Sequence, residues 1–164
     1  MSQAHDPGPA SSWLPMLRRY FALVLLGNLL WEVVQLPLYT LWTTGTWSEI
    51  AFAVAHCTAG DMLIAAVSLL CALLIAGDVR WPMAGFARVA GLALAISAGY
   101  TVFSEWLNIT VRGSWAYTDA MPVLPMLGTG LAPLLQWIVV QHIGGLIEKR
   151  NCFPVCIKIE HRTV

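Results

Sequence analysis

The chain has 164 residues, of which 58% are hydrophobic and 11% are charged, and its formal net charge is zero. A typical soluble domain has about 25% charged residues, so the composition indicates an integral membrane protein and argues against a soluble domain. A chain with balanced charge has no overall field that attracts nucleic acid, which excludes nucleic acid as a partner. The length suits a single domain.

Hydropathy divides the chain into three parts. Residues 1–14 are polar and rich in Pro, Ser and Gly, and they predict a disordered N-terminal lead. Residues 15–148 form the predicted transmembrane domain, with apolar spans at about 20–42, 50–76, 86–109 and 122–147. Residues 149–164 are the predicted cytoplasmic tail. The expected fold is an all-α membrane protein, a four-transmembrane-helix bundle with a short outer loop between the third and fourth helices.

The distribution of basic residues predicts the orientation of this bundle. Cytoplasmic loops of membrane proteins carry the excess of Lys and Arg. With both termini inside, Arg112 is the only basic residue on the outer side. The inner side carries the other eight of the nine: Arg18, Arg19, Arg80, Arg88, Lys149, Arg150, Lys158 and Arg162. This split predicts a protein of the cell membrane, the inner membrane in a bacterium, with N and C termini in the cytoplasm.

Proline, glycine and alanine predict local features of the spans. Pro37 is expected to kink the outer end of the first span. Two ridges of small residues at four-residue spacing predict close helix packing: Ala51, Ala55 and Ala59 in the second span, and Gly91, Ala95 and Gly99 in the third. Four residues predict that the first half of the fourth span is a poor regular helix: Pro125, Gly128, Gly130 and Pro133.

The first span contains a polar stripe. At about 100° per residue, its four members fall within about 60° of one another on a helix: Asn28, Glu32, Gln35 and Tyr39. A charged group at the centre of a bilayer costs about 2.5–3.5 kcal/mol even on lenient scales. The stripe is therefore expected to face other helices or a cavity.

Further polar residues of the spans and of the outer loop are expected to join this stripe in a funnel that opens to the outer side. Glu32 and Asp61 lie near the middle of their spans, and Glu105 and His56 lie further out. These four are the candidate catalytic residues. The candidate ligand-binding residues are Asn28, Gln35, Tyr39, Asn108, Arg112, Trp115 and Tyr117. The last three are expected to fold over the funnel as a lid.

Simpler structural roles are available for several of these residues. Asn28 and Gln35 are typical of interhelical hydrogen bonding, and Glu105 is placed to pair with Arg112. His56 alone is typical of a core histidine, and it lies about 140° around the helix from Asp61. Glu32 and Asp61 differ because deep carboxyl groups in membranes are rare and usually functional. At least one of them is expected to be protonated at neutral pH.

The residues identify no cofactor. A mononuclear metal site at His56, Glu32 and Asp61 is chemically possible. A bis-histidine haem is excluded, because His56 and His142 are separated by about 20 Å in depth. A di-iron centre of the four-helix type is excluded by the lack of a Glu-x-x-His motif, and no zinc-protease, esterase or P-loop motif occurs.

Three classes of function remain. The first is a membrane enzyme or binder of an apolar ligand, such as a lipid or isoprenoid, that uses the carboxyl groups as acid and base. The second is a non-catalytic subunit or assembly factor that docks a membrane partner or a second copy of itself. The third is a proton or cation transport element, against which four spans and no evident inverted repeat argue.

Overall fold

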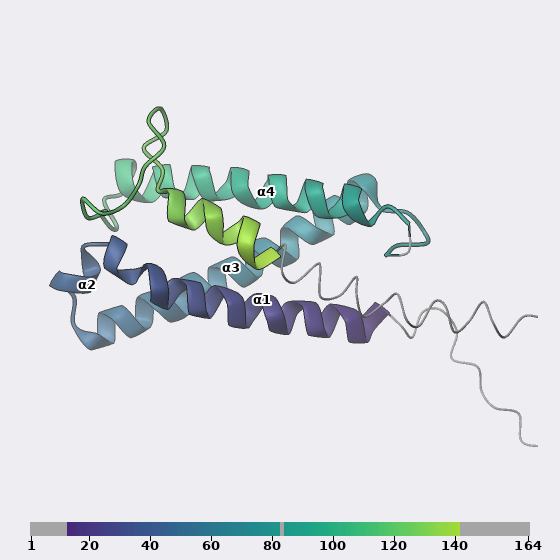
Figure 1. Ribbon diagram of the computed structural model, residues 1–164, viewed down its shortest axis with the longest axis horizontal. Helices are drawn as coiled ribbons and strands as arrows, with labels where there is room; N and C mark the ends of the chain where they lie inside the picture. Colours follow the sequence, from purple (N-terminus) through teal and green to yellow (C-terminus); the bar gives the residue numbers. More distant parts are fainter. Residues whose placement is uncertain (1–12, 83, 142–164) are drawn as a thin grey trace, which may run out of the picture.

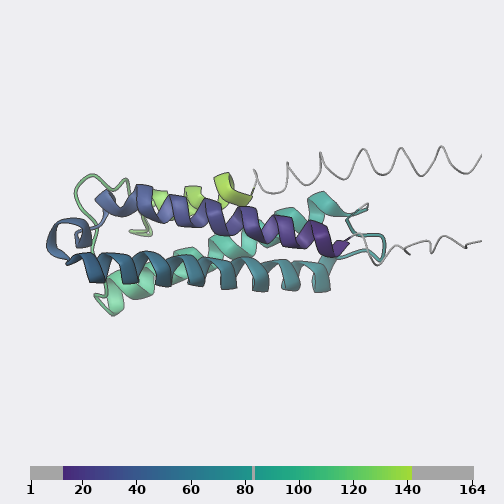
Figure 2. The ribbon, with the colours of Figure 1, turned by 90° about the horizontal axis from the view of Figure 1, so that it is seen from below.

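The computed structural model describes residues 13–82 and 84–141 of the chain. This part is helical, with α1 (Trp13–Gln35), the 3-10 turn η2 (Leu36–Leu38), α2 (Leu41–Thr44), α3 (Trp47–Ala76), α4 (Phe86–Trp106) and the π-helical turn η3 (Leu107–Val111). A last helix covers Leu131–Gln141. The long helices form an elongated bundle in which α1 and α3 lie side by side, while the irregular segment after η3 lies at the same end as α2 (Figures 1 and 2).

Three stretches are long and apolar enough to cross a membrane: Leu14–Leu38, Trp47–Ala76 and Phe86–Val111. Their outer faces carry large apolar side chains, and Leu30, Phe52 and Leu74 are each 66–78% exposed. Asn28 and Gln136, in contrast, are almost fully buried. A surface of this kind suits lipid, because a soluble protein rarely exposes large contiguous apolar patches. The protein is therefore helical in its described residues and has three helices that could span a membrane.

The first predicted span is displaced from the observed helix. α1 begins at Trp13, inside the predicted lead, and ends at Gln35, so the predicted limits of 20 and 42 are both wrong. Pro37 explains the end, because its ring lacks an N–H and clashes with a preceding turn of α-helix. The backbone tightens into η2 around Pro37 and restarts as α2 at Leu41. Residues 1–12 lie outside the described residues.

The second and third predicted spans agree with the structure to within a few residues. α3 begins at Trp47 because Thr46 and Glu49 form a reciprocal capping box at its N-terminus. The third span begins at Phe86 as predicted, and η3 extends it to Val111.

The first half of the predicted fourth span is not a regular helix, as its prolines and glycines predicted, so the predicted start at 122 is wrong for the helix itself. Residues 122–130 are irregular, with a β-bridge between Val123 and Gly130 and a left-handed Gly128 at φ 63°. Leu131 donates its N–H to the Pro122 carbonyl at 2.7 Å and starts the last helix. That helix is described to Gln141 and is shorter than a span. The four-helix count remains a prediction, because residues 142–147 and the tail at 149–164 lie outside the described residues.

Two apolar clusters hold the bundle together at different heights. Val24 of α1, Ala65 of α3 and Trp137 of the last helix form one cluster with Val140. α1 approaches the last helix closely there, since a Cβ added to Gly27 would lie 2.9 Å from Val140 Cγ1. The other cluster joins the linked ends of α3 and α4 through Ala72, Val89 and Ala93.

The two ridges of small residues do not make the predicted close packing within the described chain. Ala51, Ala55 and Ala59 are exposed on α3, and Gly91, Ala95 and Gly99 are exposed on α4. A Cβ added to Gly91 or Gly99 would meet no atom within 4 Å. The small residues that do lie between α3 and α4 are those of the second cluster, Ala72 and Ala93. A membrane partner or a second copy at the exposed ridges remains a prediction.

Candidate functional site

Glu32 and Asp61 meet at the amide of Gln136. Nε2 of Gln136 lies 2.6 Å from Asp61 Oδ2 and 3.5 Å from Glu32 Oε1. The two carboxyl groups are also within hydrogen-bonding reach of each other. These side chains come from α1, α3 and the last helix, so three elements that are distant in the sequence converge on one cluster. We call Glu32, Asp61 and Gln136 the carboxyl–amide cluster.

The polar stripe of α1 supports this cluster. Gln136 Nε2 donates to Asn28 Oδ1 at 3.1 Å, which makes Asn28 the interhelical hydrogen-bonding residue that the sequence indicated. Gln35 has a different role from the one predicted, since its Nε2 donates to Glu32 Oε1 at 2.9 Å within α1. Trp31 Nε1 in turn donates to Gln35 Oε1 at 3.2 Å. Gln35 therefore orients Glu32 and leaves the contact with other helices to Asn28.

Glu105 is held by the irregular segment of residues 112–130, here called the outer segment after its predicted side of the membrane. The Tyr117 hydroxyl donates to Glu105 Oε2 and accepts the Gly130 N–H at 2.8 Å. Position 130 requires glycine, because an added Cβ would lie 2.9 Å from the Tyr117 oxygen. Burial raises the pKa of Tyr117, and the hydrogen bond to Glu105 raises it further. Tyr117 is thus a phenol that donates at neutral pH, and it replaces Arg112 as the partner expected for Glu105.

The outer segment is joined to the end of the first span. Thr118 N donates to the Leu38 carbonyl at 2.9 Å, and Thr40 N donates to the Ala116 carbonyl at 3.0 Å. The Tyr39 and Tyr117 rings pack with centroids 5.4 Å apart. The backbone around residue 117 therefore lies over the predicted site, in the place expected for a lid, and main-chain hydrogen bonds hold it there.

A cavity of about 350 Å³ lies beside the carboxyl–amide cluster and is here called the polar cavity. Its walls come from α1, η2, α3, α4, η3, the outer segment and the last helix. The structure brings most of the predicted site residues together around it: Glu32, Gln35, Tyr39, His56, Asp61, Glu105, Asn108, Arg112 and Trp115. The remainder of the wall is largely apolar, with Leu63, Ile64 and Trp137 among its residues.

Three predicted site residues are turned away from the carboxyl–amide cluster. His56 is exposed and stacks on Phe52, with ring centroids 5.6 Å apart. Asn108 donates to the Ser104 carbonyl of its own helix at 2.9 Å. Arg112 is exposed at the edge of the polar cavity. Within residues 13–82 and 84–141, no three His, Cys, Asp or Glu side chains are grouped to hold a metal, so the possible site at His56, Glu32 and Asp61 is not assembled.

Gln136 is the functional residue that sequence analysis missed. The position of Gln136 in the sequence does indicate a buried polar contact, because an amide in the middle of an apolar helix needs hydrogen-bond partners within the protein. A carboxyl group has a larger transfer penalty than an amide, so Glu32 and Asp61 were predicted as site residues and Gln136 was not. The side chain has two N–H groups and three acceptors within 3.5 Å, so only two of these contacts are full hydrogen bonds at one time.

The chemistry available at this site is proton exchange and hydrogen bonding. Because Glu32 and Asp61 share the Gln136 amide, ionising both would place two negative charges close together, and one proton on the pair avoids this. Glu105 is close enough for its charge to act on both groups. The Trp115 indole N–H lies near Glu105 without a regular hydrogen bond and is buried without a partner. The site therefore offers acids and bases, and Trp115 Nε1 and Asn28 Nδ2 are buried donors without a partner.

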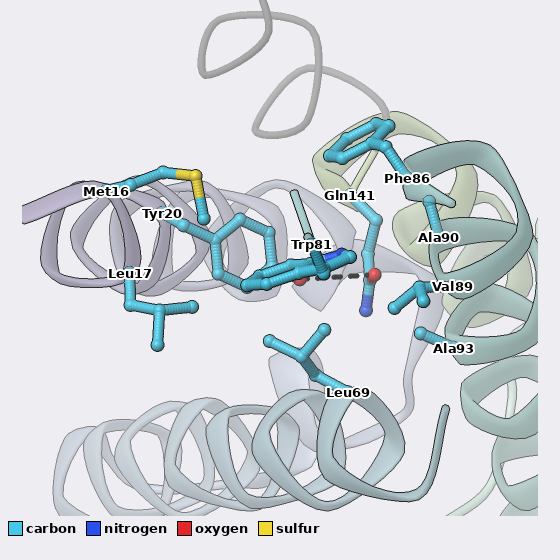
Figure 3. Close-up of a pocket in the computed structure, with 10 residues that line it drawn as sticks. All are labelled: Met16, Leu17, Tyr20, Leu69, Trp81, Phe86, Val89, Ala90, Ala93 and Gln141. Carbon is cyan, nitrogen blue, oxygen red and sulfur yellow. Dashed lines mark hydrogen bonds between the residues drawn. The ribbon is translucent and has the colours of Figure 1, made fainter. Parts of the chain in front are cut away.

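A second, smaller pocket lies near the opposite end of α1 and has a volume of about 60 Å³. Figure 3 shows Tyr20 and Trp81 pointing into it, with Tyr20 hydrogen-bonded to Gln141 at 3.2 Å. Its ten lining residues include no carboxyl group. We call it the apolar pocket, and it lacks groups for acid–base chemistry.

Comparisons with models of protein families, with curated proteins and with solved structures found no match.

Proposed function

We propose that this protein is a small multi-pass membrane protein that binds an apolar ligand with one polar group, and that Glu32 and Asp61 exchange a proton with that group. The observation that supports this most is the meeting of two carboxyl groups from different helices at the wall of the polar cavity. A purely structural network would be expected to leave no such space beside it. The cavity falls within the range of about 300–1,000 Å³ that ligand sites occupy.

The roles of the residues follow from their positions. The carboxyl–amide cluster binds the polar group of the ligand, and the proton shared by Glu32 and Asp61 is available for transfer to it. Gln136 and Gln35 orient the two acids. Glu105, held by Tyr117, is the second acid–base group, and the apolar wall accommodates the rest of the ligand.

Analysis of co-purified lipids tests the binding. Wild-type protein is purified in mild detergent, and its bound small molecules are extracted and identified by mass spectrometry. Glu32→Gln and Asp61→Asn keep the shape of each side chain but remove its exchangeable acid, so we expect about tenfold less bound ligand, a loss of about 1.4 kcal/mol in binding. Asp119→Asn is the matched control, because Asp119 is exposed and does not line the polar cavity.

The outcome distinguishes a site from a scaffold. Variants that melt at the wild-type temperature and lose the ligand support a site. Folded Glu32→Gln and Asp61→Asn proteins with wild-type ligand content would show that the carboxyl groups are structural. Incubating the identified ligand with wild type and with each variant then measures turnover. Binding without any turned-over product would reduce the proposal to a ligand-binding protein.

The proposed orientation places the outer segment outside the cell membrane and the α3–α4 loop in the cytoplasm. Its support is the basic residue distribution in the sequence. Single cysteines at Ser114 and at Val79, which is fully exposed, report the two ends of the bundle. In a background with the four natural cysteines replaced, an impermeant maleimide should label Ser114→Cys in intact cells and Val79→Cys only after lysis. The reverse pattern would invert the topology.

A further inference from the structure

The wall of the polar cavity includes residues on the outside of the bundle. Leu63 of α3 is 66% exposed and Tyr100 of α4 is 51% exposed, yet both line the same cavity as the buried Glu105 and Gln136. A cavity whose lining passes from buried to exposed residues opens where the exposed ones lie. The polar cavity therefore opens sideways, between α3 and α4.

The paths of α3 and α4 explain this opening. The two helices pack at their linked ends through Ala72, Val89 and Ala93. From there α3 crosses toward α1 and α2, while α4 continues along the other side of the bundle (Figure 1). Between the two helices, the α3 side of the cavity wall has no side-chain bulk at Gly60. A Cβ added to Gly60 would meet no atom within 4 Å. We call the gap at Gly60, Leu63 and Tyr100 the lateral opening.

The lateral opening lies near the middle of a candidate span. At 1.5 Å per residue, Gly60 is about 20 Å from Trp47 and about 24 Å from Ala76 along α3. A bilayer has an apolar core about 30 Å thick. In a membrane that surrounds this helix, the opening therefore faces acyl chains.

The other end of the polar cavity is bounded by the outer segment, where Trp115 is half-buried and Arg112 is exposed at the edge. Main-chain hydrogen bonds from Thr118 to Leu38 and from Thr40 to Ala116 join that segment to the first span. A ligand that arrives from that end passes a charged side chain and a segment held by main-chain hydrogen bonds, whereas one dissolved in the bilayer meets an opening with no side chain at Gly60.

We infer that the ligand is a single-chain amphiphile that enters from the bilayer through the lateral opening. Its polar group binds the carboxyl–amide cluster, and its chain lies along Leu63, Ile64 and Tyr100 and continues into lipid. This inference rests on the proposed function and adds the ligand class and the direction of access. A wholly water-soluble substrate fits poorly, because it would leave the largely apolar wall and the lateral opening unused.

A photoreactive long-chain alcohol tests the inference. The probe carries a diazirine next to its hydroxyl group and is added to vesicles of phosphatidylcholine that contain the purified full-length protein. After illumination, mass spectrometry locates the labelled residues. In wild type we expect labelling of residues that line the polar cavity, since the hydroxyl end carries the diazirine to the carboxyl–amide cluster.

Substitutions at glycine separate the opening from the site. Gly60→Trp places a large side chain in the lateral opening, and we expect about tenfold less labelling of the cavity. Gly91→Trp is the matched control, because Gly91 is also in a helix, also has open space above it and does not line the polar cavity. Gly60→Leu replaces Gly60→Trp if the larger side chain prevents folding.

The possible results have distinct meanings. Equal cavity labelling in Gly60→Trp and wild type overturns the lateral opening and leaves the site intact. Cavity labelling that is unchanged in a folded Glu32→Gln, Asp61→Asn double variant overturns the proposed function, because the probe then does not need the carboxyl groups. Labelling confined to the outer lipid-facing residues in wild type overturns both.

Discussion

The polar cavity and the apolar pocket lie toward opposite ends of the same bundle and differ in what surrounds their polar groups. Around the apolar pocket the polar side chains are neutral, and the Trp81 indole N–H is buried without a partner. Tyr20 donates to Gln141, and the nearby Ser97 donates to the Ala93 carbonyl at 2.9 Å. Around the polar cavity, Glu32, Asp61 and Glu105 supply more acceptors than the amide, phenol and indole groups there can satisfy.

The difference shows how one helical bundle can combine a closely packed region, around the apolar pocket, with a region that contains unsatisfied polar groups, around the polar cavity. A hydroxyl group that donates to a backbone carbonyl of its own helix carries no net charge, so helices can pack closely around it. Carboxyl groups from two helices cannot be packed in that way, because each requires donors or a proton. The half with neutral polar groups packs closely, and the half with excess acceptors retains a cavity of about 350 Å³, which the proposed function assigns to a ligand. Five tests probe this contrast, from the largest expected effect to the smallest.

Trp137→Ala should have the largest effect, because this side chain belongs to both halves. It is 1% exposed in the cluster with Val24, it lines the polar cavity, and its Nε1 donates to Thr101 Oγ1 at 2.6 Å. Removing a buried indole should lower the free energy of unfolding by about 3–5 kcal/mol. Trp106→Ala is the control, since Trp106 is 46% exposed. Equal melting temperatures for the two variants would contradict the packing role of Trp137.

Gln136→Leu and Gln141→Leu compare an amide in each half on one helix. Loss of Gln136 leaves Asn28 Oδ1 and Asp61 Oδ2 without a donor, and each buried unsatisfied group costs about 1–3 kcal/mol. Loss of Gln141 removes only longer contacts, at 3.2 Å to Tyr20 and 3.5 Å to Ser97. Thermal unfolding in matched detergent should show the larger loss for Gln136→Leu. A larger loss for Gln141→Leu would reverse the assignment of the two halves.

Tyr117→Phe should loosen the cover of the polar cavity at a cost of about 1 kcal/mol in stability. It removes the donor to Glu105 and the acceptor for Gly130. A spin label at Ser114 should become more mobile, while a label at Thr44 should not change. Unchanged mobility at Ser114 would show that the main-chain hydrogen bonds hold the segment without Tyr117.

The same label also reports a pH dependence. Because folding raises the pKa of Tyr117 above its ordinary value of 10, its contribution to stability is complete below about pH 10. It is lost as the pH rises through the higher pKa of the folded protein. The label at Ser114 should therefore have constant mobility from pH 6 to pH 9, on the acidic side of that window, and should loosen only in stronger alkali. Loosening near pH 7 would exclude Tyr117 as the titrating group.

Asp78→Asn should have the smallest effect. Asp78 lies in the α3–α4 loop and contacts Arg80 Nε at 3.4 Å. The Arg80 backbone N–H donates to it and lowers its pKa, so this contribution is present at neutral pH and is lost as the pH falls. Exposed ion pairs contribute little, and we expect no measurable change in melting temperature at neutral pH. A change in melting temperature as large as that of Gln136→Leu would remove the contrast between buried and exposed polar contacts.

The sequence was sufficient for features that depend on local chemistry. The long apolar runs around Asp61 and Glu105 predicted α3 and α4 to within a few residues, because the requirement for an apolar surface acts on each helix separately. The helical period placed Asn28, Glu32 and Gln35 on one buried face of α1. The deep carboxyl groups were predicted to meet, because neither can face lipid at low energy.

Other features depend on how the helices pack against one another. The small-residue ridges on α3 and α4 face outward, and His56 stacks on Phe52, because the crossing of the helices decides which of two similar faces is covered. Gln136 is the centre of the carboxyl–amide cluster because the last helix packs against α1 and α3, and no pattern within one helix predicts that packing. The start of that helix at Leu131 followed from the turn around Gly128, which hydropathy does not detect.

The sequence by itself therefore determined a helical membrane-type protein with a polar stripe that has to be buried, since transfer energies belong to individual residues. Tertiary structure alone decided that the stripe borders a cavity, that Tyr117 and not Arg112 holds Glu105, and that α3 and α4 separate at Gly60. These properties arise from the relative positions of side chains on different helices. Periodicity within one helix contains no information about the distance to another.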